Sequence, residues 1–273
     1  MLSPSNAVFF FFSIISMMIT PGKYFLSGFA FLCLSFTGYG QTAGQIVKVT
    51  YTSSPVSQYN LSQKDMQGTA VKASLYEFMK GITDYYSLYI NLKDRSSVYI
   101  LDSTVQVRPR GWEDSQIRAA LTDTVIFALK SAKNKTYKHE WIMNQTFFTE
   151  GEVGDISWEL GSEKKTIDGL TCYRAVAKDK YPMLTVWYTR DLPISNGPSI
   201  YQGLPGLVVW VEDYFRTTQI RNITYKDDTE AFDTLYRSKY DEFVREKERK
   251  KRYDKEPILV IKKADLANFL AAH

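Results

Sequence analysis

Residues 85–101, YYSLYINLKDRSSVYIL, decide the fold. Every second residue in the first half of this stretch is apolar, namely Tyr86, Leu88, Ile90 and Leu92. Because side chains alternate between the two faces of a β-strand, this pattern predicts a strand with one buried face. Asp94-Arg95-Ser96 then predicts a reversal into a second apolar run, residues 98–101. The stretch therefore predicts an antiparallel hairpin.

Short apolar runs separated by turn residues continue in both directions from this hairpin. Residues 45–52 alternate apolar and polar side chains, which predicts a first strand. The runs downstream cover residues 124–129, 137–143, 146–149, 157–160, 170–177, 184–189, 207–212 and 216–225. Turn signals such as Asp168-Gly169 separate most of them. Successive short strands with tight turns predict an antiparallel meander sheet in a mainly β protein of the α+β class.

One helix is predicted near the end of the chain, over residues 227–252. Its apolar stripe consists of Phe232, Leu235, Tyr236, Tyr240 and Phe243. Acidic residues gather at its start and basic residues at its end, which complements the helix dipole and favours a solvated surface helix. The alternative is a transient contact of its basic end with an anionic membrane surface.

The first 40 residues have the features of a cleavable signal peptide. Lys23 is the only charged residue among them, residues 24–36 are almost wholly apolar, and Gly38 and Gly40 form a small-x-small site before Gln41. A second apolar run precedes Lys23, so Met17 or Met18 is an alternative start. A membrane anchor is disfavoured because each run is shorter than the roughly 20 residues that a spanning helix needs. We therefore expect an exported protein, periplasmic, associated with the outer membrane or secreted.

The mature chain is expected to form a single domain, residues 41–273, with a variable N-terminal part at residues 41–84. A short helix over residues 70–81, a last strand over residues 258–261 and an apolar tail over residues 264–272 are weaker features of the pattern. Outside the leader the only cysteine is Cys172, so the mature chain cannot form an internal disulfide. Its stability must come from its core.

The composition excludes several classes of function. The net charge of +4 is too balanced for a nucleic-acid-binding protein, and no basic patch interleaves with the 19 tyrosines. The chain has two histidines, His139 and His273, so neither a serine triad nor a histidine-rich metal site is indicated. Cys172 lies among apolar residues, as a buried structural cysteine does. The sequence thus favours a protein with no catalytic residues, no metal and no cofactor.

Carboxylates are the remaining catalytic candidates. They include Glu150, Glu152, Asp155, Glu159, Asp191 and Asp213. No spacing among them singles out an acid–base pair. A hydrolase of envelope peptides or glycans that works through carboxylates and tyrosines stays open on the sequence, as the less favoured alternative.

An ordered set of motifs lies between Trp158 and Asp213. Its centre is GLPGLV at residues 203–208, preceded by VWYT at residues 186–189, Leu192-Pro193 and Gly197-Pro198. With this set the chain resembles the GLPGLI family of exported proteins from Bacteroidetes. The resemblance implies export and an uncharacterised role, and it supplies no catalytic residue.

The motif itself favours a shaped loop. Glycine permits backbone conformations closed to other residues, proline fixes its own φ, and leucine supplies an apolar anchor. Residues 190–206 therefore predict a compact loop that leads into the strand at Leu207. The motif residues that we take as a structural or binding loop are Trp187, Gly197, Pro198, Gly203, Leu204, Pro205, Gly206 and Leu207. A ligand-binding loop is the alternative, because backbone N–H groups near glycines can hold an anion or a partner strand.

Two functional hypotheses come from the predicted fold. A meander sheet with a helix can curl into a half-barrel whose concave face holds an apolar ligand or lipoprotein, a layout similar to envelope carriers of the LolA type. The second hypothesis is an interaction scaffold that pairs with an outer-membrane complex through an exposed strand edge. The sequence does not separate the two.

Overall fold

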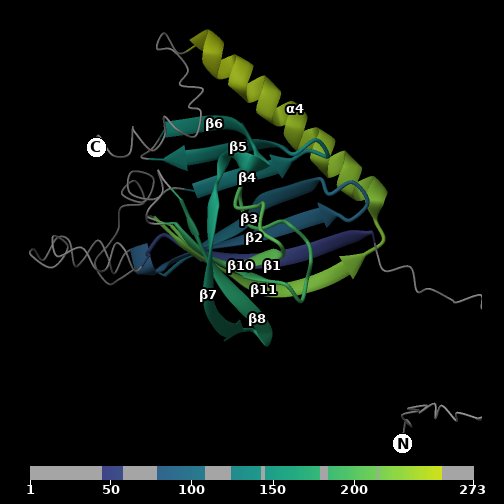
Figure 1. The fold of residues 1–273 in the computed structure, drawn as a ribbon. Helices are drawn as coiled ribbons and strands as arrows, with labels where there is room; N and C mark the ends of the chain where they lie inside the picture. Colours follow the sequence, from purple (N-terminus) through teal and green to yellow (C-terminus); the bar gives the residue numbers. More distant parts are fainter. Residues whose placement is uncertain are drawn as a thin grey trace, which may run out of the picture. The chain divides into compact units, whose positions relative to one another are not determined.

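The computed structural model describes residues 45–57, 79–107, 124–142, 145–178, 184–213 and 215–253. These residues form one antiparallel sheet of eleven strands and a long C-terminal helix (Figure 1). The strands are β1 (Ile46–Ser54), β2 (Ile82–Asn91), β3 (Ser97–Gln106), β4 (Thr124–Lys130), β5 (Lys135–Ile142), β6 (Gln145–Glu152), β7 (Trp158–Ile167), β8 (Leu170–Ala177), β9 (Thr185–Thr189), β10 (Leu207–Glu212) and β11 (Thr217–Lys226). The helix is α4 (Thr229–Tyr253). The predicted mainly β fold, with its antiparallel meander and C-terminal helix, is confirmed.

The sheet consists of two meanders joined at its centre. Its strand order is β6-β5-β4-β3-β2-β1-β11-β10-β9-β8-β7. The chain therefore runs from the centre out to β6, moves to the opposite edge at β7, and returns to the centre at β11. There β11 pairs with β1 along its whole length, from Ile46 opposite Lys226 to Ser54 opposite Thr217.

The short connection between the two edge strands forces the sheet to curl. A flat sheet of eleven strands would hold its edges about 48 Å apart, at about 4.8 Å per strand. The connection from Glu152 to Trp158 spans about 20 Å at most when extended, and part of it is a turn of 3-10 helix, Val153–Asp155. Hydrogen bonds fix this connection on both sides: Val153 N–H donates to Asn134 O at 2.9 Å, and Lys178 N–H donates to Ser157 O at 2.8 Å. The sheet is therefore an open but strongly curved one.

The central core lies inside this curve. It joins buried residues of the first meander to buried residues of the second, namely Val47, Val49, Tyr51, Tyr86, Leu88, Ile90, Tyr99 and Ala128 with Cys172, Leu207, Val209 and Ile220. The hydroxyl of Tyr51 on β1 donates to the backbone oxygen of Val208 on β10, at 2.8 Å. Since β1 and β10 are not neighbours in the sheet, this bond crosses the inside of the curve.

The helix α4 covers part of the opposite face. Phe232 and Phe243 are fully buried against Ile46, Val98, Phe127, Leu129 and Phe148. Tyr240, also part of the predicted stripe, stays partly exposed while its ring contacts that of Tyr137 at 5.2 Å. Basic residues near the helix end attach it to the edge strand β6. Lys247 forms an ion pair with Glu150 at 2.6 Å, and Lys250 donates to Thr146 O.

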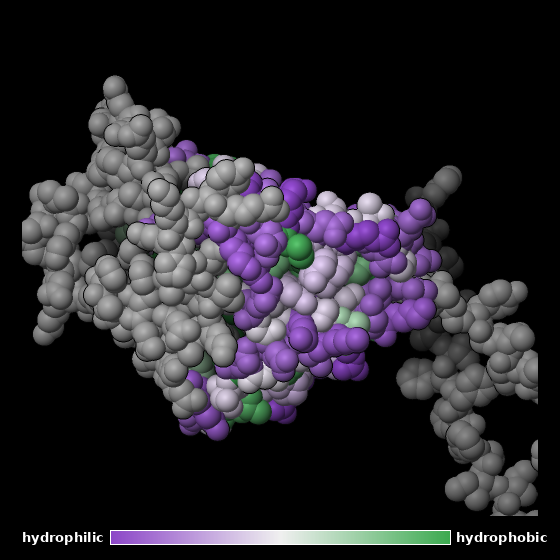
Figure 2. All heavy atoms as spheres, turned by 90° about the horizontal axis from the view of Figure 1, so that it is seen from above, coloured by the Kyte–Doolittle hydropathy of each residue, from purple (hydrophilic) through white to green (hydrophobic). Residues whose placement is uncertain are grey.

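The coloured surface in Figure 2 is mainly hydrophilic, and its hydrophobic areas are small and separate. Within the described part of the chain, no helix combines the length and the apolar character needed to cross a membrane.

Some predicted boundaries differ from the structure. Leu92 is not in a strand but in the turn after β2. Two hydrogen bonds close this turn: Asn91 N–H donates to Ser96 O, and Arg95 N–H donates to Asn91 O. Strand β7 extends well past the predicted run at residues 157–160. Its middle is polar and exposed, so a search for apolar alternation does not detect it. The predicted leader, most of the helix over residues 70–81, the strand over residues 258–261 and the apolar tail lie outside the described residues.

A buried ion pair lies at one end of the core. Arg216 and Asp84 are 4% and 1% exposed and form a salt bridge. Arg216 Nε also donates to Ser53 Oγ at 2.8 Å, and the hydroxyls of Ser53 and Thr218 are hydrogen-bonded at 2.7 Å. These polar groups tie together β1, β2 and β11 where the two meanders meet.

We expect Asp84→Ala to lower the free energy of unfolding by about 3–5 kcal/mol, because Arg216 would stay buried without this partner. Urea denaturation of the mature protein measures the change. Glu163→Ala is the matched control, since Glu163 and Arg174 form an exposed pair at 2.9 Å whose loss should cost less than about 1 kcal/mol. Equal effects of the two substitutions would contradict a structural role for the buried pair.

Candidate functional site

The loop over residues 190–206 connects β9 to β10 and fills the inside of the curve. Leu192, Ile194 and Ile200 pack against the central core. Asn196 is 1% exposed, its backbone oxygen accepts from Val208 N–H at 2.9 Å, and the Ser97 hydroxyl donates to its Oδ1 at 3.4 Å. The loop therefore reaches from the second meander to β3 of the first.

Glycines are required at three positions of the loop. A Cβ on Gly197 would lie 2.5 Å from the backbone oxygen of Tyr201. Gly203 has a φ of +89°, a left-handed conformation that other residues rarely adopt. A Cβ on Gly206 would lie 1.9 Å from the backbone oxygen of Thr189, so the chain can pass there only without a side chain. Leu204 and Leu207 are buried anchors, and Pro205 is exposed between them.

The second half of the loop holds the connection between the edge strands. The indole of Trp158 donates to Gln202 O at 2.7 Å. Leu204 and Ile156 share one hydrophobic cluster with Ala175, Val186, Tyr188, Val208 and Val211 on the outer side of β8, β9 and β10. The motif loop thus contacts both the inside of the curve and the connection that causes it.

Trp187 lies beside two residues that no sequence pattern singled out. Its ring stacks with that of Trp210, with centroids 6.5 Å apart and an angle of 22° between the planes. Lys165 Nζ lies 4.1 Å from the Trp187 centroid and 3.2 Å from the Trp210 centroid. Burial lowers the pKa of Lys165 from its ordinary 10.5 to about 8, while Cys172 and Glu212 act in the other direction. We call these three residues, Trp187, Trp210 and Lys165, the tryptophan box.

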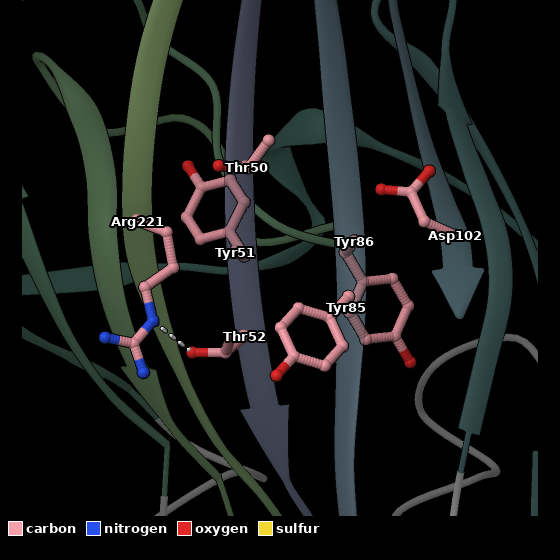
Figure 3. A pocket seen from close by; sticks show the side chains of 7 residues that line it. All are labelled: Thr50, Tyr51, Thr52, Tyr85, Tyr86, Asp102 and Arg221. Atoms are coloured by element: carbon pink, nitrogen blue, oxygen red, sulfur yellow. Dashed lines mark hydrogen bonds between the residues drawn. The ribbon is translucent and has the colours of Figure 1, made fainter. Parts of the chain in front are cut away.

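A groove of about 500 Å³ lies over the central strands (Figure 3). It is lined by Thr50, Tyr51, Thr52, Tyr85, Tyr86, Asp102 and Arg221, from β1, β2, β3 and β11. Thr50, Thr52 and Tyr85 alternate along their strands with Tyr51 and Tyr86 of the central core, so they face the same side as α4. The helix covers one part of this face, and the groove lies on another part of it.

Two β-bulges supply the charged residues of the groove. The pairing of β1 with β11 skips Arg221 at one register shift, and the pairing of β2 with β3 skips Asp102 at another. Bulges redirect side chains and often occur beside functional sites. Arg221 Nε donates to Thr52 Oγ1 at 2.9 Å, drawn as a dashed line in Figure 3, and Ser87 donates to Asp102 at 2.6 Å. Tyr85 is 41% exposed beside them.

The carboxylates that the sequence offered as catalytic candidates serve mainly local structure. Glu152 and Asp155 lie together in a capping box, in which Glu152 N–H donates to Asp155 at 2.7 Å. Asp213 closes a turn by accepting from Arg216 N–H at 2.7 Å and from the Tyr201 hydroxyl at 2.8 Å, and Asp191 accepts from Thr171 N–H at 3.0 Å. His139 stacks on Phe148, and burial lowers its pKa. Within the described ranges no three histidine, cysteine or acidic side chains form a metal-binding group.

Cys172 is fully buried, and burial raises the pKa of its thiol to about 11. A thiol of such a pKa is a poor nucleophile at neutral pH. Among the described residues that line the groove, Asp102 is the one carboxylate. These residues do not include the pair of carboxylates that a glycosidase uses.

Residues 176–210 match a family model described as "Protein of unknown function (Porph_ging)". The chain carries the GLPGLI-family segment. The matched residues run from the end of β8 through β9 and the GLPGLI loop to Trp210 in β10. The predicted family resemblance is thereby confirmed over this segment. No curated protein matches the chain.

Solved structures show only distant likeness to this chain. Two crystal structures of PNGF-II each share 16% identity with it, with TM-scores of 0.37 and 0.38. They match 66% and 69% of this chain but 28% and 30% of PNGF-II, so the chain spans less than a third of that protein. An uncharacterized conserved protein from Thermus thermophilus has a TM-score of 0.30 and 6% identity, with 67% of this chain and 80% of that chain covered. Likeness at this level carries no functional argument.

We expect Gly206→Ala in the GLPGLI loop to lower the free energy of unfolding by about 2–3 kcal/mol, because the new Cβ would overlap Thr189 O. Thermal and urea unfolding measure the loss. Gly154→Ala is the control, since nothing lies within 4 Å of a Cβ at that position, and its effect should stay within about 0.5 kcal/mol. A neutral Gly206→Ala variant would show that the loop is not packed as described.

We expect Lys165 to titrate near pH 8, because the two indole rings keep water from its ammonium group. NMR of the lysine Cε resonances against pH measures the midpoint. A wild-type midpoint above about 10 would contradict the enclosed position of the amine.

Proposed function

We propose that the protein is an exported, non-catalytic binding protein of the cell envelope and that the groove over β11, β1, β2 and β3 is its ligand site. The observation that supports this most is the pair of β-bulges, which bring Arg221 and Asp102 to the same groove as Tyr85. Export and envelope location are supported by the leader pattern and by the GLPGLI resemblance.

The inside of the curve is a poor site for the apolar ligand that the half-barrel hypothesis expects. The loop over residues 190–206 places Leu192, Ile194 and Ile200 there, against core residues that are themselves fully buried. Protein interiors packed in this way have little room for a ligand. The binding hypothesis therefore moves from the concave face to the groove on the α4 side.

The groove favours an amphipathic ligand over a wholly apolar one. The exposed ring of Tyr85 offers a flat apolar surface, on which sugar rings and side chains can pack. Arg221 uses Nε for Thr52, and its planar guanidinium has further donors that suit a carboxylate or phosphate. Asp102 adds an acceptor for hydroxyl or amide groups. An anionic glycan or peptide fragment of the envelope combines these features.

The scaffold hypothesis retains one supporting observation. Strand β7 ends the sheet, and most of its residues are exposed. However, Glu159, Glu163 and Lys164 put charges along this strand, and its pairing with β8 is interrupted between Leu160 and Lys164. Charges and bulges on an edge strand are features that prevent pairing with another chain. We therefore place the scaffold role second.

The mature protein, residues 41–273, would be titrated by calorimetry with soluble peptidoglycan fragments, lipopolysaccharide fragments and short acidic peptides. Native mass spectrometry of protein from its own envelope identifies any co-purified ligand. For the probe that binds, we expect Tyr85→Ala and Arg221→Ala each to weaken binding about tenfold, or about 1.4 kcal/mol, as central contacts of an interface do.

Two substitutions serve as matched controls for this experiment. Tyr225→Ala and Arg245→Ala remove exposed side chains of the same types outside the groove, and both should leave the affinity unchanged. Binding that survives loss of Tyr85 and Arg221, or a co-purified ligand held elsewhere, would refute the assignment of the groove.

A further inference from the structure

We propose that Trp187 and Trp210 form a binding site for a small organic ammonium ion and that Lys165 occupies this site while no such ion is bound. The tryptophan box lies on the inner side of the second meander, where Trp187 packs against the central core, so this site is separate from the groove. The proposal stands independently of the proposed function.

The spacing of the two rings suits a single cationic group. Their centroids are 6.5 Å apart and their planes are nearly parallel. This separation is slightly less than two carbon–carbon contact distances of about 3.5–4.0 Å each, so the space admits a compact –NH3⁺ head group but not a quaternary ammonium group. The ammonium of Lys165 occupies this space, within 4.1 Å of both centroids. A cation between two indole faces is attracted to both of them.

A buried carboxylate adds to the preference for cations. Glu212 on β10 is 3% exposed, and its charge acts on Lys165. Aromatic faces combined with a nearby negative charge favour the binding of an ammonium group. The indole N–H of Trp210 is buried and makes no hydrogen bond among the described residues. Its ring therefore owes its position to packing and to the cation rather than to a polar contact.

The fold restrains the two tryptophans more than it restrains Lys165. Trp187 and Trp210 are paired residues of the adjacent strands β9 and β10, and Trp187 packs against the central core. Lys165 comes from β7, the edge strand, where Lys164 and Thr166 on either side are exposed. All three residues of the box are themselves partly exposed. The lysine side chain can thus swing out to water while the two rings stay in place.

Because Lys165 occupies the site, it lowers the apparent affinity for any ion that competes for the same space. The apparent affinity falls with the fraction of molecules whose site is empty, so a site filled about nine times in ten by Lys165 would bind about tenfold more weakly than an empty one. Removal of the Lys165 side chain should therefore reveal the intrinsic affinity of the two rings.

The test is a titration of the mature protein with methylammonium chloride at neutral pH, followed by calorimetry and by intrinsic tryptophan fluorescence. Sodium chloride at equal concentrations is the reference. We expect Lys165→Ala to bind the ion at least about tenfold more tightly than wild type. Adding Trp210→Ala to that variant should abolish binding.

Lys164→Ala is the matched control, because Lys164 contacts the ring of Tyr173 and not the box. It should bind methylammonium as wild type does. Lys165→Thr, which suits a β-strand, replaces Lys165→Ala if the alanine variant does not fold. The proposal is overturned if a folded Lys165 variant binds no more tightly than wild type, or if Lys164→Ala produces the same gain.

Discussion

The five residues that join β6 to β7 connect the two edges of an eleven-stranded sheet. Such a short connection is compatible only with a strongly curved sheet. Curvature brings β1 and β10 within hydrogen-bonding distance across the inside, and it creates a volume that must be filled. The loop over residues 190–206 fills that volume, and its last residues pack against the same connection.

This arrangement gives the GLPGLI-family segment a structural meaning. Gly206 lets two backbone segments pass at close range, Gly203 supplies a left-handed turn, and Leu204 and Leu207 anchor the loop on either side. Each of these requirements follows from packing. The segment also includes Trp187 and Trp210, so the tryptophan box depends on the strands that the loop connects.

Recognition is then left to the outer face of the sheet and to the partly exposed tryptophan box on the inner side of the second meander. On the outer face, α4 buries aromatic residues of β4 and β6. The groove with Tyr85, Asp102 and Arg221 lies on the part of this face that the helix does not cover. The buried Arg216–Asp84 pair and the partly buried Asp213 turn are committed to structure.

The sequence by itself determined the strands, the helix stripe of α4 and the family segment, because alternation, helical spacing and a glycine-proline motif are local patterns. It extended β2 too far, to Leu92, and missed the polar half of β7, where burial does not follow the pattern. Only the tertiary structure decided the groove and the tryptophan box. Arg221 and Asp102 meet through register shifts between strands, and Lys165 reaches Trp187 and Trp210 through the packing of separate strands. Both depend on contacts between residues distant in the chain, which no local pattern records.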